Sequence, residues 1–362
     1  MTGRRASGVR LVAYSDASSF GGAERSFANL LARLDPSFEV VVVAVDPDVG
    51  EVLRGARNGS PLRLVRQVRG KWDLGRFRQH LAAVRDLKPE IFHANLWTTF
   101  SGQYGVAAAL LTPGVRAVVV EQSPLPTASG LQRRLRRLGA RRLAAHVAVG
   151  ERAAREVEAA IGLPTGSVRT IYNGVQDEPV EPLPRLAEGP VVGAVGRLSP
   201  EKGFDLALRA LRELPEATLV LVGDGPERAR LEELASELGV ASRLFLVGWS
   251  DEPRRYLPGF DALLLPSRHE GFPLAVVEGM LAGLPVVATD VGSVREAVLD
   301  DETGYLVPPG DVEAMAERLR PLLGNADLAG RLGARGRARA LKLFTADAMA
   351  ASFEALYREI LA

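Results

Sequence analysis

The chain of 362 residues contains no cysteine, which excludes disulfides and thiolate metal sites and fits a cytosolic protein. Its four histidines, at positions 80, 93, 146 and 269, do not have the spacing of metal ligands. No apolar run reaches the ~18–20 residues that a membrane span needs. The amino terminus is polar and leads directly into a predicted strand, so we expect no signal peptide.

Other common patterns are absent as well. The dinucleotide pattern G-x-G-x-x-G does not follow the first predicted strand, which argues against a nicotinamide-dependent enzyme. Basic residues are not interleaved with aromatic ones, so we expect no nucleic acid as a partner. Residues 1–180 nevertheless carry 25 Lys and Arg against 16 Asp and Glu, and the remainder carries 20 against 28. A basic first half suggests an anionic partner there, such as a membrane surface, a lipid phosphate or a polyanionic glycan.

What the sequence does contain is a regular alternation of short apolar strands and amphipathic helical stretches, which is typical of parallel sheets covered by helices. Strands are predicted first at 10–14, 39–45, 62–65, 91–93, 117–120, 146–149 and 168–171. The segment 177–190 is rich in proline and acids, the composition of a linker. Further strands are predicted at 191–195, 218–222, 244–247, 262–265, 286–288 and 304–307, and a final helix at 346–361. We therefore predict an α/β protein with two doubly wound domains, 1–176 and 177–345, each with a ligand crevice at the carboxyl ends of its strands.

Two carboxylates eight positions apart, Glu270 and Glu278, flank a predicted strand-to-helix turn at Gly271. The helix is predicted at 273–281, with Pro273 in its first turn. Such a turn directs unpaired backbone N–H groups and the positive end of a helix dipole at a ligand, which suits phosphate. Carboxylates accept hydrogen bonds from pairs of hydroxyls, so this arrangement suits a nucleotide-sugar. Taken alone, a Glu pair on a helix is more often a solvated face.

A second cluster about seventy residues upstream favours the ligand site. The sequence G-R-L-S-P-E-K-G at 196–203 follows the strand 191–195 and precedes a helix predicted from about Phe204. It places Arg197 and Lys202 five positions apart among glycines, where they can neutralise a diphosphate. Arginine offers a planar fork and lysine a mobile point charge. The alternative is a surface loop with ordinary basic residues, which the two clusters together disfavour.

Three weaker features fit either a ligand role or a structural one. Gly21 and Gly22 follow the first strand and let a ligand approach the backbone, although a lone Gly-Gly pair is a weak signal. The segment G-D-G-P at 223–226 is either a tight turn or a ligand-facing loop. Trp249 ends a strand and either borders a nucleobase or packs against the fold.

The first half holds two features of the same kind. His93 ends the fourth strand and either contacts a sugar or acceptor hydroxyl or is structural. Six arginines lie between Arg133 and Arg142, in a stretch whose leucines 131, 135 and 138 are expected to form a buried stripe. This stretch is either a solvated helix or a basic amphipathic helix, 131–143, that docks on an anionic membrane.

Five motifs together resemble the large retaining GT-B glycosyltransferase family of bacterial polysaccharide and lipid glycosylation, over essentially the whole chain. They are G-G-A-E-R at 21–25, I-Y-N-G-V at 171–175, G-R-L-S-P-E-K-G at 196–203, G-D-G-P at 223–226 and E-x7-E at 270–278. The resemblance implies two Rossmann-like domains facing a cleft, with the carboxyl-terminal helix 346–362 returning to the first domain. It also implies a nucleotide diphosphate-sugar donor held mainly by the second domain, no catalytic metal and no cofactor, since the donor is a co-substrate.

The resemblance further implies a role for each motif residue. Arg197 and Lys202 would hold the diphosphate and stabilise the leaving group, Glu278 would bind the ribose hydroxyls, and Glu270 would contact the donor sugar. The donor site would be completed by backbone groups, those of Gly196, Gly223, Gly225, Gly271, Phe272, Pro273 and Leu274. Gly21 and Gly22 would close over the diphosphate and acceptor from the first domain, with His93 near the sugar.

The sequence departs from the family pattern at two places. The family often has a histidine after the fifth strand of the first domain, and Gln122 stands in that place here. Glutamine forms hydrogen bonds but exchanges no proton, which puts an acid–base role there in doubt. Gly150 stands where a serine is common.

The sequence therefore predicts a retaining glycosyltransferase. It would move a sugar from a nucleotide diphosphate-sugar to a hydroxyl of a glycan or lipid-linked acceptor, in cell-surface polysaccharide, glycolipid or related glycoconjugate synthesis. The expected location is the cytoplasm, including the inner face of the cell membrane. Two alternatives stay open: a nucleotide-sugar epimerase on the same architecture, and a non-catalytic nucleotide-sugar-binding partner.

Overall fold

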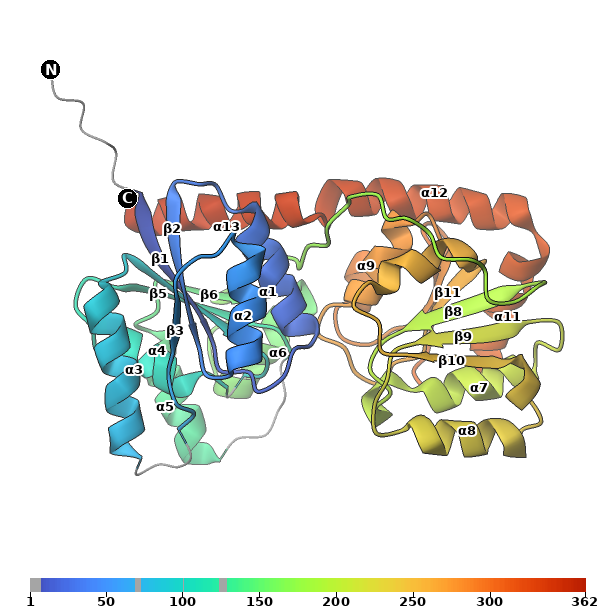
Figure 1. Ribbon diagram of the computed structural model, residues 1–362, viewed down its shortest axis with the longest axis horizontal. Coiled ribbons are helices and arrows are strands. Elements are labelled where there is room, and N and C mark those ends of the chain that lie inside the picture. The colour runs from blue at the N-terminus through green and yellow to red at the C-terminus, as the bar shows by residue number, and fades with distance from the viewer. Residues whose placement is uncertain (1–7, 69–72, 100, 124–128) are drawn as a thin grey trace, which may run out of the picture. The chain divides into compact units, whose positions relative to one another are not determined.

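The computed structural model describes residues 8–68, 73–99, 101–123 and 129–362 (Figure 1). The chain divides into two compact units. Unit 1 comprises the residues up to Gln176 together with Ala346–Ala362, and unit 2 comprises Asp177–Thr345. Each unit contains one sheet with helices packed against it, and all strand pairs in both sheets are parallel.

Unit 1 contains a seven-stranded sheet in the order β3-β2-β1-β4-β5-β6-β7. Its strands are β1 (Val9–Ser15), β2 (Phe38–Ala44), β3 (Leu62–Leu64), β4 (Ile91–Leu96), β5 (Arg116–Glu121), β6 (Ala145–Ala148) and β7 (Arg169–Thr170). Its helices are α1 (Gly22–Arg33), α2 (Pro47–Ala56), α3 (Leu74–Leu87), α4 (Gln103–Leu110), α5 (Gly130–Ala140), α6 (Glu151–Ile161) and α13 (Ala346–Leu361).

Unit 2 contains a six-stranded sheet in the order β10-β9-β8-β11-β12-β13. Its strands are β8 (Val191–Val195), β9 (Thr218–Val222), β10 (Leu244–Gly248), β11 (Ala262–Leu265), β12 (Val286–Thr289) and β13 (Tyr305–Val307). Its helices are α7 (Phe204–Arg212), α8 (Arg228–Glu237), α9 (Leu274–Leu281), α10 (Val294–Ala297), α11 (Val312–Gly324) and α12 (Ala326–Leu343). Three short 3-10 helices complete the unit, η1 (Pro200–Lys202), η2 (Ala241–Arg243) and η3 (Pro253–Gly259).

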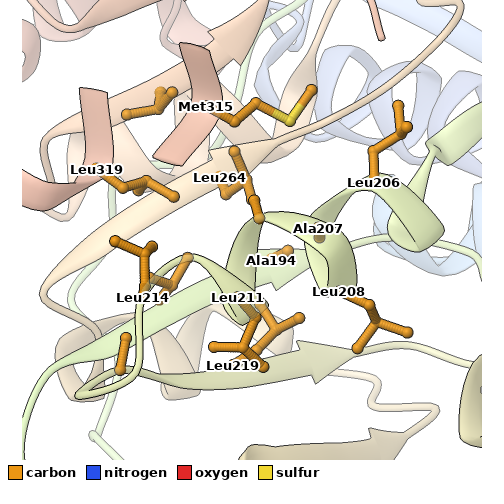
Figure 2. Packing of buried hydrophobic residues seen from close by; sticks show 14 of the residues in the cluster. Ala194, Leu206, Ala207, Leu208, Leu211, Leu214, Leu219, Leu264, Met315 and Leu319 are labelled. Carbon is orange, nitrogen blue, oxygen red and sulfur yellow. The ribbon is translucent and has the colours of Figure 1, made fainter. Parts of the chain in front are cut away.

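The apolar composition of the strands follows from this architecture. Central strands of a parallel sheet are covered on both faces, so they read as continuous apolar runs. All six residues of β4 and all four of β11 are buried. In unit 2, α7 packs its leucines on the sheet beside residues of α11 (Figure 2). The resulting cluster includes Ala194 of β8, Leu219 of β9, Leu264 of β11 and Met315 of α11.

The strand order reverses in each sheet, between β1 and β4 in unit 1 and between β8 and β11 in unit 2. At such a reversal the loops on the two sides of it turn away from one another, which opens a crevice at the carboxyl ends of the strands. The sequence motifs lie in these loops: Gly21 and Gly22 follow β1, residues 196–203 follow β8, and residues 266–273 follow β11. The predicted fold class, two doubly wound parallel-sheet domains, is confirmed.

Two local expectations were wrong. The sequence predicts the helix after the first strand from near Ser26, but it begins at Gly22, where Glu24 Oε2 accepts a hydrogen bond from Gly21 N at 3.1 Å. The leucine stripe of α5 is not buried: Leu131, Leu135 and Leu138 are 63%, 60% and 60% exposed. Arginines, rather than leucines, attach this helix to unit 1, as described below.

Candidate functional site

Four loops at the carboxyl edge of the unit 2 sheet are in contact through their backbones. The loop after β8 bonds to the loop after β9, since Leu198 N donates to the Asp224 carbonyl oxygen at 3.0 Å. It also bonds to the loop after β11, since Arg268 N donates to the Glu201 carbonyl oxygen at 2.7 Å. The loop after β12 joins them, because Ser293 N donates to the Gly271 carbonyl oxygen at 3.1 Å. The two predicted clusters, 196–203 and 270–278, therefore belong to one assembly.

Glycines allow these loops to approach so closely. A Cβ at Gly292 would overlap the Glu270 carbonyl oxygen, and one at Gly203 would overlap the carbonyl oxygen of Pro266. Both glycines have left-handed backbone, with φ of +50° and +65°, which disfavours any other residue. Gly223 and Gly225 touch the backbone of the 196–198 segment in the same way. The role of G-D-G-P at 223–226 as a tight packing element is thus evident, and its role toward a ligand stays a prediction.

Lys202 and Glu270 meet at the centre of this assembly. Lys202 Nζ lies 2.7 Å from Glu270 Oε1, and Ser267 Oγ donates to the same oxygen at 2.7 Å. Glu270 and Ser267 are buried, whereas about a quarter of the Lys202 side chain is exposed. A buried carboxylate that is paired and hydrogen-bonded fixes the position of the ammonium. The ammonium is thereby held at the carboxyl edge with one side toward solvent.

The turn 271–274 leads from this pair into α9. Pro273 occupies the N-cap position of the helix, and Leu274 is its first residue. Glu278 lies about one turn beyond Leu274 in α9 and is buried. Within the described part of the chain, no hydrogen bond engages the N–H of Gly271, which precedes the helix N-terminus. This geometry provides a donor and a partial positive charge beside Lys202, as an anion site requires.

Arg197 stands apart from that pair. Its side chain is exposed, and among the residues that the structure describes it forms no hydrogen bond or ion pair. Its charge still acts on this loop. Burial raises the pKa of Glu201, but the hydrogen bond from Ser199 and the charges of Lys202 and Arg197 outweigh burial and lower it. The structure thus brings Lys202 and Glu270 together, while convergence of Arg197 with them on one diphosphate stays a prediction.

Trp249 follows β10 at the same edge. Gly223 N donates to the Gly248 carbonyl oxygen at 2.9 Å, which joins this strand end to the loop after β9. The indole is 60% exposed, and its Nε1 donates to Asp251 Oδ1 at 3.1 Å. Of the two sequence interpretations, packing against the fold is therefore wrong. The exposed ring is available for stacking.

In unit 1 the corresponding edge is joined by side chains. Ser26 Oγ donates to Asn173 Oδ1 at 2.6 Å, and Asn173 Nδ2 donates to Gln122 Oε1 at 2.8 Å. Gln122 Nε2 donates to Asn95 Oδ1 at 2.8 Å, and Asn95 Nδ2 donates to the Ala23 carbonyl oxygen at 3.2 Å. This polar chain connects α1, β4, β5 and the segment after β7. It fixes the first turn of α1, which carries Gly21 and Gly22 at its start.

Comparison with known proteins places both units in one family. The description "Glycosyltransferase Family 4" matches residues 20–178, and "Glycosyl transferases group 1" matches residues 176–339. The chain belongs to the GT-B glycosyltransferases of the family 4 type.

Named relatives agree with this assignment. The lipopolysaccharide core biosynthesis glycosyltransferase LpsE of Rhizobium meliloti is 33% identical over 185 residues, 51% of this chain and 52% of that protein. The 2-deoxystreptamine glucosyltransferase of Streptomyces kanamyceticus is 33% identical over 220 residues, 56% of this chain and 55% of that protein. The chain thus spans about half the length of these curated relatives. Among solved structures, HepE of Anabaena in complex with UDP has a TM-score of 0.85 at 20% identity, covering 97% of this chain and 100% of that one.

The sequence-based role of His93 in this glycosyltransferase is contradicted by its position. The imidazole is 1% exposed and stacks on Phe27, with ring centroids 4.8 Å apart. Its Nδ1 lies 2.5 Å from the hydroxyl of Tyr357 on α13, and Phe353 lies beside it. Burial lowers the pKa of His93 to about 3, so the ring is neutral. The residue lies within β4 rather than at its end, so that prediction was wrong. It points into the core and anchors α13 instead of facing a sugar.

Gln122 is also structural in this glycosyltransferase. Both ends of its amide are engaged by neighbouring amides in the polar chain, and the side chain is buried. A glutamine suits this place because an amide donates at one end and accepts at the other. The I-Y-N-G-V motif pointed to Asn173. No pattern marked Ser26, Asn95 or Ser267, since single polar residues carry no periodic signal.

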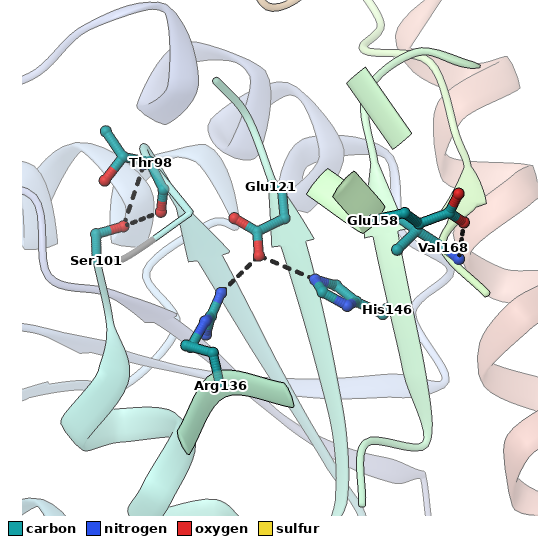
Figure 3. Close-up of polar contacts among 7 residues, drawn as sticks. All are labelled: Thr98, Ser101, Glu121, Arg136, His146, Glu158 and Val168. Carbon is teal, nitrogen blue, oxygen red and sulfur yellow. Dashed lines mark hydrogen bonds and ion pairs between the residues drawn. The ribbon is translucent and has the colours of Figure 1, made fainter. Parts of the chain in front are cut away.

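A buried carboxylate attaches the basic helix α5 to the sheet (Figure 3). Glu121, at the end of β5, accepts from Arg136 at 2.6 Å and lies 2.9 Å from His146 Nε2 on the same oxygen. Arg133 caps α6 by donating to the carbonyl oxygens of Ala159 and Ala160. These contacts explain why the leucines of α5 are exposed. The arginines of one face hold the helix, so the opposite face is turned outward.

Neither a metal-binding cluster nor a membrane-spanning helix is present among the described residues. In 8–68, 73–99, 101–123 and 129–362, no group of three or more His, Cys, Asp or Glu side chains is placed to bind a metal ion. In the same residues, no helix combines the length and the apolarity needed to cross a bilayer. The expected absence of a catalytic metal stays a prediction.

Proposed function

We propose that this protein transfers a sugar from a nucleotide diphosphate-sugar to an acceptor hydroxyl with retention of anomeric configuration. The observation that carries the proposal is the Lys202–Glu270 pair beside the N-terminus of α9. A fixed ammonium, a helix terminus and a buried carboxylate suit an anion that is linked to a sugar. Membership in the family 4 type supports the same reaction. UDP is bound by HepE, which shares the fold.

In this proposal the charged groups act on the leaving group. Lys202 and Arg197 hold the diphosphate, and the backbone at 271–274 completes its cradle. Glu278 takes the ribose hydroxyls, and Glu270 contacts the donor sugar while it keeps Lys202 in place. Gly196, Gly223 and Gly225 allow the donor to approach the backbone. Contact of Gly21 and Gly22 with the donor or acceptor remains a prediction.

The proposed reaction proceeds on one face of the sugar. The acceptor hydroxyl attacks the anomeric carbon from the side on which the nucleoside diphosphate departs. The new carbon–oxygen bond forms as the bond to the diphosphate breaks, and a diphosphate oxygen takes the hydroxyl proton. Negative charge develops on the departing diphosphate as its bond to the anomeric carbon breaks, ahead of the proton transfer, so Lys202 and Arg197 stabilise the transition state more than the ground state. No metal ion takes part in this scheme.

A donor screen followed by product analysis tests the proposal. Thermal unfolding is measured with UDP-, GDP-, ADP- and dTDP-sugars, and one donor is expected to stabilise the protein far more than the others. That donor is then incubated with candidate glycans, with and without EDTA, and the anomeric configuration of the product is read by NMR. Inverted product would refute retention, and loss of activity in EDTA would refute metal independence. If no donor stabilises the protein, the proposed site is wrong.

The same screen separates the two alternative functions. An epimerase isomerises the donor without an acceptor, so a new sugar nucleotide would appear with donor alone. A non-catalytic partner binds the donor and never consumes it. Family membership and the fixed Lys202–Glu270 pair favour the transferase over both.

We further propose that α5 docks the protein on an anionic membrane, which would give access to a lipid-linked acceptor at the inner face of the cell membrane. At about 100° per residue, Leu131, Leu135 and Leu138 share the face opposite the anchoring Arg133 and Arg136. Beside the leucines, residues 134, 137 and 141 are arginines whose side chains form no hydrogen bond or ion pair in the described residues. Exposed leucines flanked by unpaired arginines are what an anionic interface binds.

Vesicle sedimentation tests this docking. Wild type is expected to bind phosphatidylglycerol vesicles and not phosphatidylcholine vesicles. Replacing arginines 134, 137 and 141 by Gln should weaken binding about 100-fold, since each basic residue contributes about 1 kcal/mol at such a surface. The change Leu341→Ser, on an exposed leucine of α12, is the control. Equal binding to both vesicle types, or none, would exclude the membrane role and leave a solvated helix.

A further inference from the structure

The carboxyl edge of the unit 1 sheet carries two acids that have no role in the proposed reaction, and one of them, Glu24, belongs to the G-G-A-E-R motif. Asp16 follows β1, and Glu24 lies in the first turn of α1. Asp16 Oδ2 accepts from Gly102 N at 2.5 Å, and Glu24 Oε2 accepts from Gly21 N at 3.1 Å. The second oxygen of each carboxyl is buried and has no hydrogen-bond partner in the described residues. Glu24 as a whole is 3% exposed.

These two carboxyls are close enough to interact. Burial raises the pKa of Glu24 to about 7, and the charge of Asp16 raises it further. Burial also raises the pKa of Asp16. No lysine or arginine is among the groups that act on either acid, although the first half of the chain is rich in arginine. An unpaired buried carboxylate is costly, and such groups are normally paired.

An exposed aromatic ring lies at the same strand ends. Trp97 follows β4 and is 50% exposed. Ser15 and Asn95 are register partners on the adjacent strands β1 and β4, so Trp97 follows β4 one residue beyond the position opposite Asp16. Gly102, the N-cap residue of α4, lies at the same strand ends, since its N–H donates to Asp16. Asn95 also holds Ala23, next to Glu24, by the polar chain.

We propose that Asp16, Glu24 and Trp97 form the acceptor subsite of this glycosyltransferase, for a sugar ring that carries a protonated amine. An ammonium supplies several donors and a positive charge, which is what two carboxyls with unpartnered oxygens lack. The indole face receives the apolar face of the ring and attracts the cation. A neutral hydroxyl would bring one donor and no charge. This inference rests on the proposed function, in which unit 1 receives the acceptor.

Binding of a matched pair of sugars tests it without any catalysis. The probes are 6-amino-6-deoxyglucose and glucose, which differ by one group, and affinity is measured by saturation-transfer NMR at pH 7.5. Wild type should bind the amino sugar at least about ten-fold more tightly, as expected for a charge-assisted pair. In Asp16→Asn the preference should disappear, while the Gly102 N–H keeps its acceptor. The exposed Asp48→Asn on α2 is the matched control and should keep the preference.

A second variant separates the ring contact from the charge. Trp97→Ala should weaken the binding of both sugars by a similar factor and keep the preference for the amino sugar. Because Trp97 is exposed, this change should leave the fold intact. Equal affinity of wild type for the two sugars, or a preference that persists in Asp16→Asn, would overturn the proposal. Donor-induced thermal stabilisation is measured on the same samples. Donor binding without amino-sugar binding refutes this subsite alone, whereas absent donor binding refutes the proposed function.

Discussion

In unit 2 the loops at the carboxyl edge touch one another backbone to backbone, whereas in unit 1 the corresponding segments are joined by amide and hydroxyl side chains. The unit 2 contacts run through glycines such as Gly203 and Gly292, and they place a satisfied pair, Lys202 and Glu270, at the centre. The unit 1 edge instead leaves one carboxyl oxygen of Asp16 and one of Glu24 without a hydrogen-bond partner among the described residues.

The two edges therefore differ in how their ligand-facing geometry is held in place. Contacts between backbones are compatible with few residue types at the contact positions. They also hold the loops rigidly, so the geometry around Lys202 is fixed before a ligand binds. Side-chain contacts can be exchanged residue by residue, so the edge of unit 1 can vary with its ligand. A shared diphosphate suits the first arrangement, and a variable acceptor suits the second.

Removing the fixed cation should have the largest effect. Lys202→Ala is expected to lower turnover about 10²–10³-fold, because a preorganised charge at the leaving oxygen is lost. Turnover is measured with the donor found by thermal shift, and folding is checked by the melting temperature. Lys342→Ala, an exposed lysine on α12 of the same unit, should retain full turnover. Wild-type turnover in Lys202→Ala would contradict the assigned role.

Adding one methyl group between two unit 2 loops should destabilise that unit strongly. Gly292→Ala combines left-handed backbone with an overlap on the Glu270 carbonyl oxygen, and is expected to cost about 2–4 kcal/mol. Gly310→Ala has the same kind of backbone, with φ of +84°, but open space around its Cβ. Chemical denaturation should therefore show a cost of only about 1 kcal/mol for Gly310→Ala. An equal loss of stability in the two variants would mean that backbone strain, and not contact between the loops, determines the effect.

The buried acid of unit 1 should make stability depend on pH. Burial, followed by the charge of Asp16, raises the pKa of Glu24 from 4.5 to about 7, so the folded state binds its proton more tightly than the unfolded state. The contribution of Glu24 to the free energy of unfolding is fully present below about pH 4.5. It is lost as the pH rises through about 7, and the loss is on the order of 3 kcal/mol. Glu24→Gln cannot ionise, so its melting temperature relative to wild type should rise between pH 5 and pH 8. A difference that is constant with pH would show that Glu24 titrates normally.

Breaking the polar chain of unit 1 should cost less than the glycine change in unit 2. Asn173→Ala leaves Ser26 Oγ and Gln122 Oε1 without their partner, for an expected loss of about 1–3 kcal/mol. Adding Gln122→Leu removes a second member of the chain, so the double variant should lose less than the sum of the single ones. Melting curves of the four proteins give this comparison. Strict additivity would indicate that the chain is not a connected unit.

Replacing the buried histidine should hardly affect the reaction. His93→Phe keeps an aromatic ring against Phe27 and removes the hydrogen bond to Tyr357. Its kcat/KM is expected to stay within about two-fold of wild type, because the ring does not face a ligand. A change of ten-fold or more with an unaltered melting temperature would restore His93 to the site.

The sequence predicted the strands and the unit 2 loops well because both depend on local signals. Continuous apolar runs mark strands buried on two faces, and glycines with charged neighbours mark turns at their ends. It could not predict that His93 points inward, since successive side chains of a strand leave opposite faces of the sheet, and both faces of this strand are buried. The exposed leucines of α5 were missed for a different reason. Periodicity identifies an apolar stripe but not the Glu121–Arg136 contact that turns it outward.

The contacts through Gly203, Gly223, Gly225 and Gly292 also limit how such an enzyme can be re-engineered. A segment transplanted alone from a relative would have to reproduce the path of three neighbours, atom for atom, to avoid a collision. Changing the preferred nucleotide should therefore succeed through outward side chains such as Trp249, or through exchange of all four segments as a block. Piecemeal grafting at this edge should yield misfolded protein rather than new specificity.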